Sequence, residues 1–329
     1  MSLKIGNIEL KSRVILAPMA GITTFSYRKF MASFGVGATY TEMISDCGLI
    51  YDNKRTKQMI ESDGRDRPLG IQLFGGSKET LLKGAKIIEE LGVDYDFLDL
   101  NFACPVPKVT KNNGGSSRLQ NTEELYKTTK AIVEQSSKPV TAKIRLGYNT
   151  VNVIENCKAL EKAGVAFIAI HARTRKELYA GKPHFEELAT LKDEIKVPFG
   201  VSGNIFSVGE ALEALRITRA DAILVARGGE GNPELITNIN HALNNEPYDE
   251  TQNFERQKGY LFKFAKMLIE EKGEQRAISM LKGIAPKFFN YEFPFVKELR
   301  KNLSSQIDSY DKIVKIVDEY EKKYVLSDK

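Results

Sequence analysis

The chain reads Phe97-Leu98-Asp99-Leu100-Asn101-Phe102-Ala103-Cys104-Pro105-Val106-Pro107-Lys108-Val109, which joins an apolar, strand-like run to a lone thiol. Pro105 and Pro107 lack a backbone N–H and fix φ, so the chain neither continues as a central strand nor enters a helix at once. We therefore expect a stiff loop that presents Cys104. Two interpretations stay open here: a half-buried structural cysteine, the commoner fate of a lone thiol, and a thiol that takes part in proton chemistry.

Length and composition are those of a globular protein. The 329 residues are 42% hydrophobic and 28% charged, which suits one large domain and a smaller one. The apolar runs are too short to span a bilayer and the N-terminus lacks a signal-peptide core, so we expect a cytoplasmic protein without membrane contact. With three distant cysteines and three histidines, we expect neither a disulfide scaffold nor a metal site.

The positive charge is unevenly distributed. A net charge of +5 does not by itself identify a nucleic-acid binder, but from Thr251 onward 16 Lys and Arg face 12 Asp and Glu. The segment from Arg276 to Tyr291 contains no acid. This segment is a candidate basic face.

Eight apolar, β-branched runs recur along the first three quarters of the chain, separated by helical patterns. The runs are Val14–Ala17, Ala38–Glu42, Pro68–Phe74, Phe97–Asn101, Val140–Leu146, Ala166–His171, Pro198–Ser202 and Asp221–Ala226. The helical patterns include Thr80–Leu91, Thr122–Gln135, Val151–Ala163, Ser207–Leu215 and Pro233–Leu243. Eight strand–helix units in this length predict a TIM (β/α)8 barrel over residues 1–245.

An active site in such a barrel lies at the carboxyl ends of the strands, and these ends carry unusual residues here. They are Pro18-Met19-Ala20, Glu42, Gln72, Asn101 with Cys104, Lys143 with Arg145, His171 with Arg173, Ser202-Gly203-Asn204, and Ala226-Arg227-Gly228. One polar strand end is ordinary, but all eight together favour a site.

The last two strand ends suggest a phosphate. TIM barrels often bind phosphate at the loops after strands seven and eight, where small residues expose backbone N–H groups. Ser202-Gly203-Asn204 and Ala226-Arg227-Gly228-Gly229 fit this pattern. Glycines that only make tight turns are the alternative for either loop alone.

Lys143 stands inside a β-branched run, where a solvated lysine is not expected. Pointing into the barrel, it could form a Schiff base or bind an electron-rich cofactor ring through its charge. Pointing outward, it would only pack its stem among the helices. His171 also follows an apolar run. Either it points into the barrel and serves the site, or it is a buried histidine whose hydrogen bonds are satisfied within the protein.

Together, these motifs resemble those of the tRNA-dihydrouridine synthases, flavoproteins of the TIM-barrel class, over essentially the whole chain. The residues that carry the resemblance are 16–21, 41–43, 70–75, 101–113, 143–147, 171–175 and 232–233. The stretches Cys-Pro-Val-Pro-Lys-Val and His-Ala-Arg-Thr-Arg are the most specific, whereas Pro-Met-Ala is shared with other flavin barrels.

The resemblance implies FMN as cofactor, with NADPH or NADH as reductant. The implied ring contacts are Pro18, Met19, Ala20, Gln72, Lys143 and His171, and the implied phosphate contacts are Ser202, Gly203, Asn204, Ala226 and Arg227. Lys143 would then favour the reduced flavin through its charge, and the Schiff-base interpretation loses weight.

The implied reaction reduces the C5–C6 double bond of uracil in tRNA: hydride moves from the flavin to C6, and Cys104 gives a proton to C5. A thiol with an ordinary pKa of about 8.5 is largely protonated at neutral pH and can serve as an acid. Asn101, Arg145, Arg173 and Arg175 are the implied substrate contacts near the barrel mouth.

The resemblance also implies a small all-helical, tRNA-binding domain over residues 246–329, in a protein expected to be a monomer. A uridine must leave its stack to reach the barrel mouth, and contacts elsewhere must offset that cost. Arg276, Lys282, Lys287 and Arg300 are candidate phosphate contacts, each with solvated surface charge as its alternative. Phe288, Phe289 and Tyr291 are expected in the core rather than as stacking surfaces.

The chain departs from the family pattern at two places. Ala103 stands where the family usually has glycine, and Ser202 and Asn204 stand in a stretch that usually reads Gly-Asn-Gly-Asp, so a neutral amide replaces an acid. The residues alone leave open a flavin-barrel reductase of a free pyrimidine or other small activated alkene, and a tRNA-binding protein without catalysis.

Overall fold

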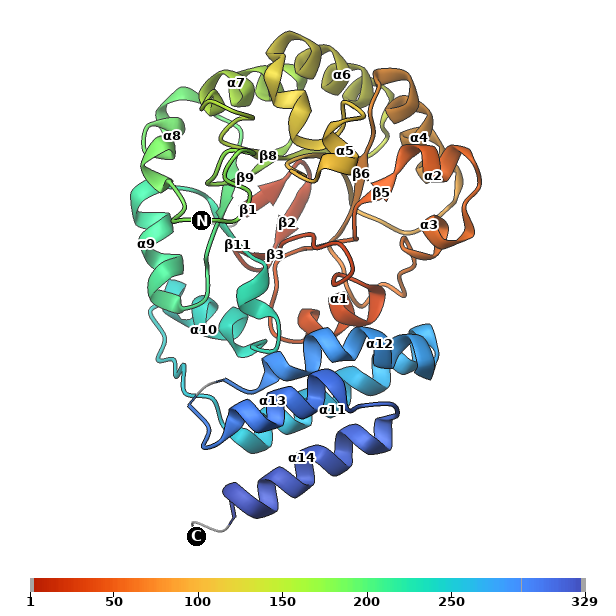
Figure 1. The fold of residues 1–329 in the computed structure, drawn as a ribbon. Coiled ribbons are helices and arrows are strands. Elements are labelled where there is room, and N and C mark those ends of the chain that lie inside the picture. Colours follow the sequence, from red (N-terminus) through yellow and green to blue (C-terminus); the bar gives the residue numbers. More distant parts are fainter. Residues whose placement is uncertain (1–2, 291, 327–329) are drawn as a thin grey trace.

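The computed structural model describes residues 3–290 and 292–326, in which alternating strands and helices are followed by helices alone (Figure 1). The strands are β1 (Leu3–Ile5), β2 (Ile8–Leu10), β3 (Val14–Leu16), β4 (Thr39–Tyr40), β5 (Ile44–Ser45), β6 (Leu69–Phe74), β7 (Phe97–Phe102), β8 (Val140–Arg145), β9 (Phe167–His171), β10 (Phe199–Ser202) and β11 (Ala222–Val225). The helices of the first part are α1 (Phe25–Ala32), α2 (Asp46–Ile50), α3 (Lys54–Gln58), α4 (Lys78–Glu90), α5 (Pro107–Thr110), α6 (Thr122–Gln135), α7 (Val153–Ala163), α8 (Leu191–Glu194), α9 (Val208–Thr218) and α10 (Glu234–Leu243). The last helices are α11 (Phe254–Lys272), α12 (Glu274–Ile284), α13 (Val296–Ser305) and α14 (Tyr310–Tyr324), and short 3₁₀ turns cover Gly115–Gln120, Phe185–Leu188, Arg227–Gly229 and Ala285–Phe288.

Eight parallel strands form the barrel, in the order β3-β11-β10-β9-β8-β7-β6-β4, and β5 pairs with the end of β6. The ring closes between β3 and the residues before β4. There the Gly37 N–H donates to the Val14 carbonyl (2.7 Å), and the Leu16 N–H donates to the Ala38 carbonyl (3.0 Å). Each predicted run overlaps one of the eight strands, so the predicted TIM barrel is confirmed.

Aromatic side chains fill the barrel, and a hairpin covers its amino end. Phe97 and Phe167 point inward beside Gly70 and Gly200, where a Cβ would overlap the two rings. The antiparallel β1–β2 hairpin, which the sequence analysis did not predict, adds Leu3, Ile5 and Leu10 to this cluster. With the amino end closed by apolar packing, the carboxyl end is left for a site.

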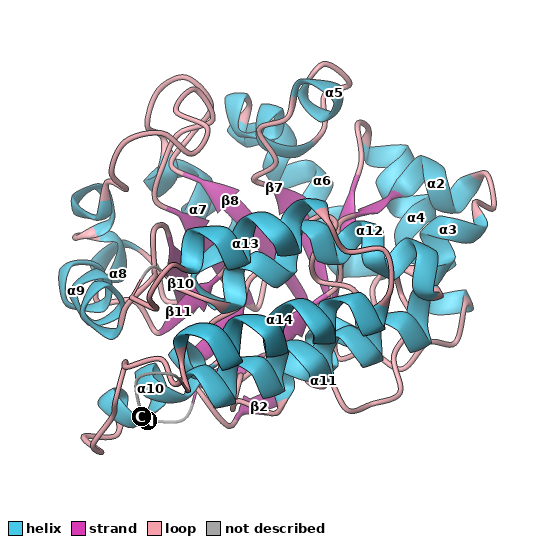
Figure 2. Ribbon diagram, turned by 60° about the horizontal axis from the view of Figure 1, so that its bottom comes forward, coloured by secondary structure: helices cyan, strands magenta, loops and turns pink. Residues whose placement is uncertain are grey.

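Helices α11 to α14 lie together on one side of the barrel (Figures 1 and 2), where α11 packs against α1 and binds Glu234 of α10 through Tyr260 and Arg256. The contact is aromatic, since Phe264 of α11 packs on Tyr27 and Phe30 of α1 with ring centroids 5.7 and 5.5 Å apart. Phe288 and Phe289 are fully buried, as predicted, whereas Tyr291 lies outside the described residues. The helical C-terminal region is therefore confirmed; the division at residue 245 stays a prediction.

Polar contacts also join the helical region to two barrel loops. A Glu271 carboxylate oxygen accepts from the Ser26 N–H (2.7 Å) and from its hydroxyl, at the start of α1. Lys287 forms an ion pair with Glu230 in the loop after β11. In the same loop Gly231 has φ +75°, and a Cβ there would overlap the backbone of Lys287. The helical region is thus fitted closely to the loops after β3 and β11.

Candidate active site

A cavity of about 1320 Å³ opens at the carboxyl ends of the strands. It is lined by residues that the sequence analysis singled out: Pro18, Met19, Ala20, Gln72, Asn101, Cys104, Lys143, Arg145, His171, Ser202, Gly203, Asn204, Ala226 and Arg227. The strand registers explain the gathering, because β7 pairs Asn101 with Lys143 of β8, and β8 pairs Arg145 with His171 of β9.

The Cys104 loop is held by bonds from both sides. The Asn101 side-chain oxygen accepts from the N–H groups of Ala103 (3.1 Å) and Cys104 (2.9 Å). The Cys104 carbonyl accepts from the N–H (3.0 Å) and the hydroxyl (2.8 Å) of Ser116. Gly115 passes close by with φ +56°, and a Cβ there would lie 2.7 Å from the Cys104 oxygen. The predicted stiff loop therefore exists.

The Cys104 thiol is half-buried at the cavity wall. Burial raises the pKa of Cys104, while a bond from the Val106 N–H and the charges of Arg145 and Lys143 act in the opposite direction. The net direction is upward, so the thiol is protonated at neutral pH and can act as an acid.

Alanine at position 103 is compatible with the backbone of the loop. Ala103 is absent from the residues with positive φ, so this conformation does not require glycine. Its N–H binds Asn101, and its carbonyl accepts from Nε of Arg145 at 2.8 Å. The departure from the family pattern leaves these bonds intact.

Below the cavity, a chain of buried hydrogen bonds crosses three strands. The Asp99 carboxylate accepts from the Thr141 hydroxyl (2.6 Å) and from Nε2 of Gln72 (2.7 Å). Oε1 of Gln72 in turn accepts from Nδ2 of Asn101 at 2.7 Å. All four side chains are buried. Burial raises the pKa of Asp99 to about 6, and the bonds from Gln72 and Thr141 limit the rise.

Lys143 lines the cavity, which excludes the outward orientation among the helices. The pKa of Lys143 falls to about 8, first because protein surrounds its amino group and then because Arg145 is close; Asp99 and Cys104 act in the opposite direction. Among the described residues, Lys143, Arg145 and Arg227 form no ion pair with a carboxylate. Uncompensated positive charge at a half-enclosed cavity suits an anionic ligand.

His171 is buried at the cavity wall and neutral. Its pKa lies well below the ordinary value because of burial and then because of four neighbouring cations, of which Lys143 is the strongest. A guanidinium can only donate, so Nε2 of His171 accepts from Arg173 (3.3 Å) and Nδ1 donates to Ser202 Oγ (3.4 Å). The ring is therefore both satisfied and close to the cavity.

Arg173 follows the end of β9, as expected, but it is not among the residues that line the cavity. Its side chain is fully buried outside the cavity lining, and its guanidinium donates to the carbonyls of Ala180 (2.9 Å) and Gly181 (2.6 Å) and to Oδ1 of Asn204 (3.1 Å). These carbonyls lie in the loop after β9, which folds back over the strand end. In the structure Arg173 holds this loop against Asn204, and its contact with substrate stays a prediction.

Other predicted cations also lie outside the cavity lining. Arg175 stacks on Tyr148, with 4.9 Å from the guanidinium carbon to the ring centroid. Arg276 and Lys282 are exposed on α12. Of the remaining candidates, Lys287 is paired with Glu230, and Arg300 donates to the Phe289 carbonyl at 2.6 Å. The Lys287 contact joins the helical region to the barrel, and the Arg300 contact joins two parts of the helical region.

The cavity lining also contains residues that the sequence analysis did not single out, among them Tyr179, Phe206 and Glu230. Tyr179 is 55% exposed, and the guanidinium carbons of Arg145 and Arg227 lie 5.2 and 5.4 Å from its ring centroid. Phe206 is also exposed beside Arg227, and Glu230 is buried at the cavity edge. All three lie in or next to irregular loops, where no periodic pattern marks them; only their closeness to the predicted glycine loops could have suggested them.

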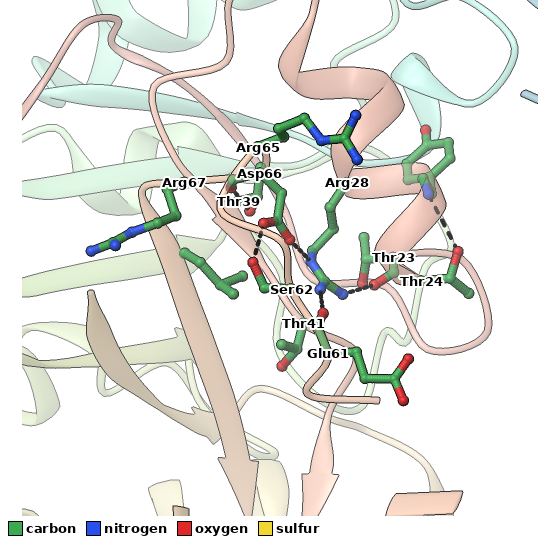
Figure 3. A network of polar contacts seen from close by, with 12 residues as sticks. Thr23, Thr24, Arg28, Thr39, Thr41, Glu61, Ser62, Arg65, Asp66 and Arg67 are labelled. Atoms are coloured by element: carbon green, nitrogen blue, oxygen red, sulfur yellow. Dashed lines mark hydrogen bonds and ion pairs between the residues drawn. The ribbon is translucent and has the colours of Figure 1, made fainter. Parts of the chain in front are cut away.

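The loop that carries Pro18, Met19 and Ala20 is anchored by a buried ion pair (Figure 3). Nε of Arg28 donates to Asp66 at 2.8 Å, and both side chains are fully buried. The other guanidinium nitrogens donate to the carbonyls of Thr23 (2.9 Å) and Glu61 (2.6 Å), while the Ser62 hydroxyl donates to Asp66 (2.5 Å). This network fixes the end of the loop to the segment before β6.

A family model described as dihydrouridine synthase (Dus) matches residues 15–323. The chain belongs to the dihydrouridine synthase family. The probable tRNA-dihydrouridine synthase of Rickettsia conorii is 36% identical over 245 residues, 73% of each chain. The tRNA-dihydrouridine synthase B of Pseudomonas aeruginosa is 32% identical over 242 residues, 73% of this chain and 72% of that one. The probable tRNA-dihydrouridine synthase 1 of Synechocystis is 31% identical over 304 residues, 92% and 84% of the two chains.

Solved structures with the same barrel are much more distant in sequence. An old yellow enzyme homologue from Zymomonas mobilis matches with a TM-score of 0.53 at 14% identity, over 79% of this chain and 97% of that one. A 6-hydroxypseudooxynicotine amine oxidase from Pseudomonas geniculata matches with a TM-score of 0.55 at 13% identity, over 74% and 49%. At these identities the likeness supports the fold alone. The family membership inferred from the motifs is confirmed, and with it an enzyme of the oxidoreductase class.

Within residues 3–290 and 292–326, no helix combines the length and the apolar character needed to cross a bilayer.

Proposed function

We propose that this enzyme reduces uridines in tRNA to 5,6-dihydrouridine, with FMN as cofactor and NADPH or NADH as reductant, acting as a monomer in the cytoplasm. One observation carries the proposal: the protonated thiol of Cys104 lines the same cavity as the unpaired cations Lys143 and Arg227. The names of the relatives, tRNA-dihydrouridine synthases, support the choice of substrate.

The cavity fits a flavin phosphate in its chemistry. Pro18, Met19 and Ala20 offer an apolar wall for a ring, and Gln72 and Lys143 offer polar groups for its edge. Ser202–Asn204 and Ala226–Arg227 would hold the phosphate, where the cation of Arg227 balances its charge. When bound, the flavin supplies the hydride that adds to C6 of uracil.

Cys104 then completes the reduction. Its S–H bond breaks as the proton moves to C5, so the product gains one hydride and one proton. Because burial keeps the thiol protonated, no separate base has to activate it. Lys143 and Arg145 lie close enough to stabilise the thiolate that remains, since both lower the pKa of this thiol.

The rim of the cavity offers contacts for a base that has left its stack. Tyr179 presents a ring held by Arg145 and Arg227, and we include it with Arg145 and Asn101 among the proposed substrate contacts. Arg276 and Lys282, which are exposed on α12, remain proposed contacts to RNA phosphates.

A half-reaction assay tests this function. The purified protein should be yellow, lose its flavin absorbance on anaerobic addition of NADPH, and regain it on addition of tRNA transcribed without modification. Free uridine, tested beside tRNA, should reoxidise the flavin far more slowly. Reoxidation by the free base alone would favour the small-molecule reductase, and a protein that neither bleaches nor reoxidises would overturn the proposal.

A further inference from the structure

Asp99 is a buried carboxylate with no role in the reaction described so far. It lies in the middle of β7, is fully buried, and is not part of the cavity lining. Its two oxygens accept from Thr141 (2.6 Å) and Gln72 (2.7 Å). Burying a charge inside a barrel costs free energy, so a neutral side chain would be a cheaper way to fill this space.

A carboxylate differs from a neutral side chain in the direction of its hydrogen bonds. Ionised Asp99 can only accept, so Gln72 must turn its NH₂ group toward it. The Gln72 oxygen then faces Asn101 and accepts from Nδ2 of that residue. The Asn101 oxygen is thereby left to face the loop, where it accepts from the N–H groups of Ala103 and Cys104.

The reverse arrangement would fail at the loop. If the side-chain amides of Gln72 and Asn101 were both rotated by 180°, Nδ2 of Asn101 would face the N–H groups of Ala103 and Cys104. All of these groups are donors, so no hydrogen bond could form between them. The Cys104 backbone would then lose the bonds that hold it at the end of β7.

We propose that Asp99 is a positioning residue: by accepting from Gln72 it sets the orientation of the Gln72 and Asn101 amides, and through them the backbone that carries Cys104. This inference rests on the proposed function, in which Cys104 gives the proton and Gln72 meets the flavin. Asp99 contacts neither the thiol nor the cavity: it acts on the Cys104 loop through the two amides, and on Lys143 only through its charge.

Two substitutions separate orientation from packing. Asp99→Asn keeps an oxygen that can accept from Gln72, whereas Asp99→Leu keeps the branched shape but replaces both oxygens by larger methyl groups that cannot accept. In the Leu variant the Cys104 loop is released. Reoxidation of reduced flavin by tRNA should then slow by about 10- to 100-fold, the loss expected when a reacting group is misplaced by about 1 Å. Reduction of the flavin by NADPH should slow much less, and the Asn variant should retain most of both rates.

The three cysteines supply a readout that does not depend on activity. Alkylation by iodoacetamide, followed at each cysteine by mass spectrometry, should be faster at Cys104 in the Leu variant than in the wild type or the Asn variant. Cys47 is exposed and should react in every protein, whereas Cys157 is fully buried and should stay protected while the barrel is folded.

The outcomes are decisive. Equal alkylation of Cys104 in the wild-type and Leu proteins would overturn the proposal. If Cys157 also reacts in the Leu variant, the larger leucine has disturbed the barrel, and the smaller Asp99→Ala variant, which also lacks an acceptor, is compared with the wild type in the same way. Loss of Cys157 protection in the Ala variant too would make Asp99 a folding residue and overturn the proposal. If wild-type flavin is not reoxidised by tRNA, the proposed function fails, and alkylation alone decides the role of Asp99.

Discussion

Replacing Asp66 by asparagine leaves the Arg28 guanidinium as a buried cation without its counter-charge. Both side chains are fully buried and their atoms lie 2.8 Å apart, so water cannot take over the lost interaction. Removing one partner of such a pair costs about 3–5 kcal/mol. Because domains are stable by only about 5–15 kcal/mol, Asp66→Asn should lose at least about a fifth of that stability.

Urea unfolding of the purified variants measures this loss, and the same segment provides the control. Asp63 pairs with Arg65 in the same loop, but its side chain is 32% exposed and that of Arg65 66%. Asp63→Asn should therefore cost at most about 1 kcal/mol.

The substitution should also weaken flavin binding. Arg28 holds the Thr23 carbonyl at the end of the loop that carries Pro18, Met19 and Ala20, so a shift of Arg28 frees that loop. The flavin fluorescence that appears when the protein is diluted measures this weaker binding. The reasoning is refuted if Asp66→Asn loses no more stability than Asp63→Asn.

Three further predictions concern the site. Cys104→Ala should keep flavin and NADPH oxidation but lose uridine reduction by about 10²–10⁴-fold, measured as dihydrouridine in tRNA; an undiminished yield would exclude the thiol as the acid. Gly115→Ala places a Cβ 2.7 Å from the Cys104 carbonyl at φ +56°, so it should slow uridine reduction and cost about 1–2 kcal/mol in urea unfolding. Gly92→Ala, with φ +65° and open space, should cost similar stability but leave the reaction unchanged; equal reaction rates in both variants would count against the contact. The pKa of Asp99 is raised from 3.8 to about 6, so ionisation should cost the wild type about 2 kcal/mol of stability as pH rises from 4 to 7. The unfolding free energy of Asp99→Asn minus that of the wild type should rise by this amount over the same range, and a constant difference would contradict the shift.

The barrel strands could be predicted because each is a local run of β-branched and apolar residues that ends in a polar group. The hairpin Leu3–Ile5 and Ile8–Leu10 could not, since three-residue strands carry too little alternation to stand out. The same holds for the short helices α2 and α3, which have five residues each.

Much of the site could also be predicted, because parallel strands bring their carboxyl ends together. What the sequence cannot show is which partner each polar group takes. Arg145 and Arg173 both stand at strand ends, and both donate to carbonyls of the loop after β9: Arg145 to Thr174 and Leu178, and Arg173 to Ala180 and Gly181. The partners of Asp99 are 27 and 42 residues away, so its central place emerges only when neighbouring strands are in register.

Because Gly231 fits closely against the backbone of Lys287, the helical region could not simply be replaced by that of a relative. A chimera that joins this barrel to the helices of a relative would bring a foreign backbone against a loop that has no room even for a methyl group. The loop after β11, with Glu230 and Gly231, would have to be exchanged together with the helices. Because that loop also carries Arg227, any such exchange would rebuild part of the cavity as well.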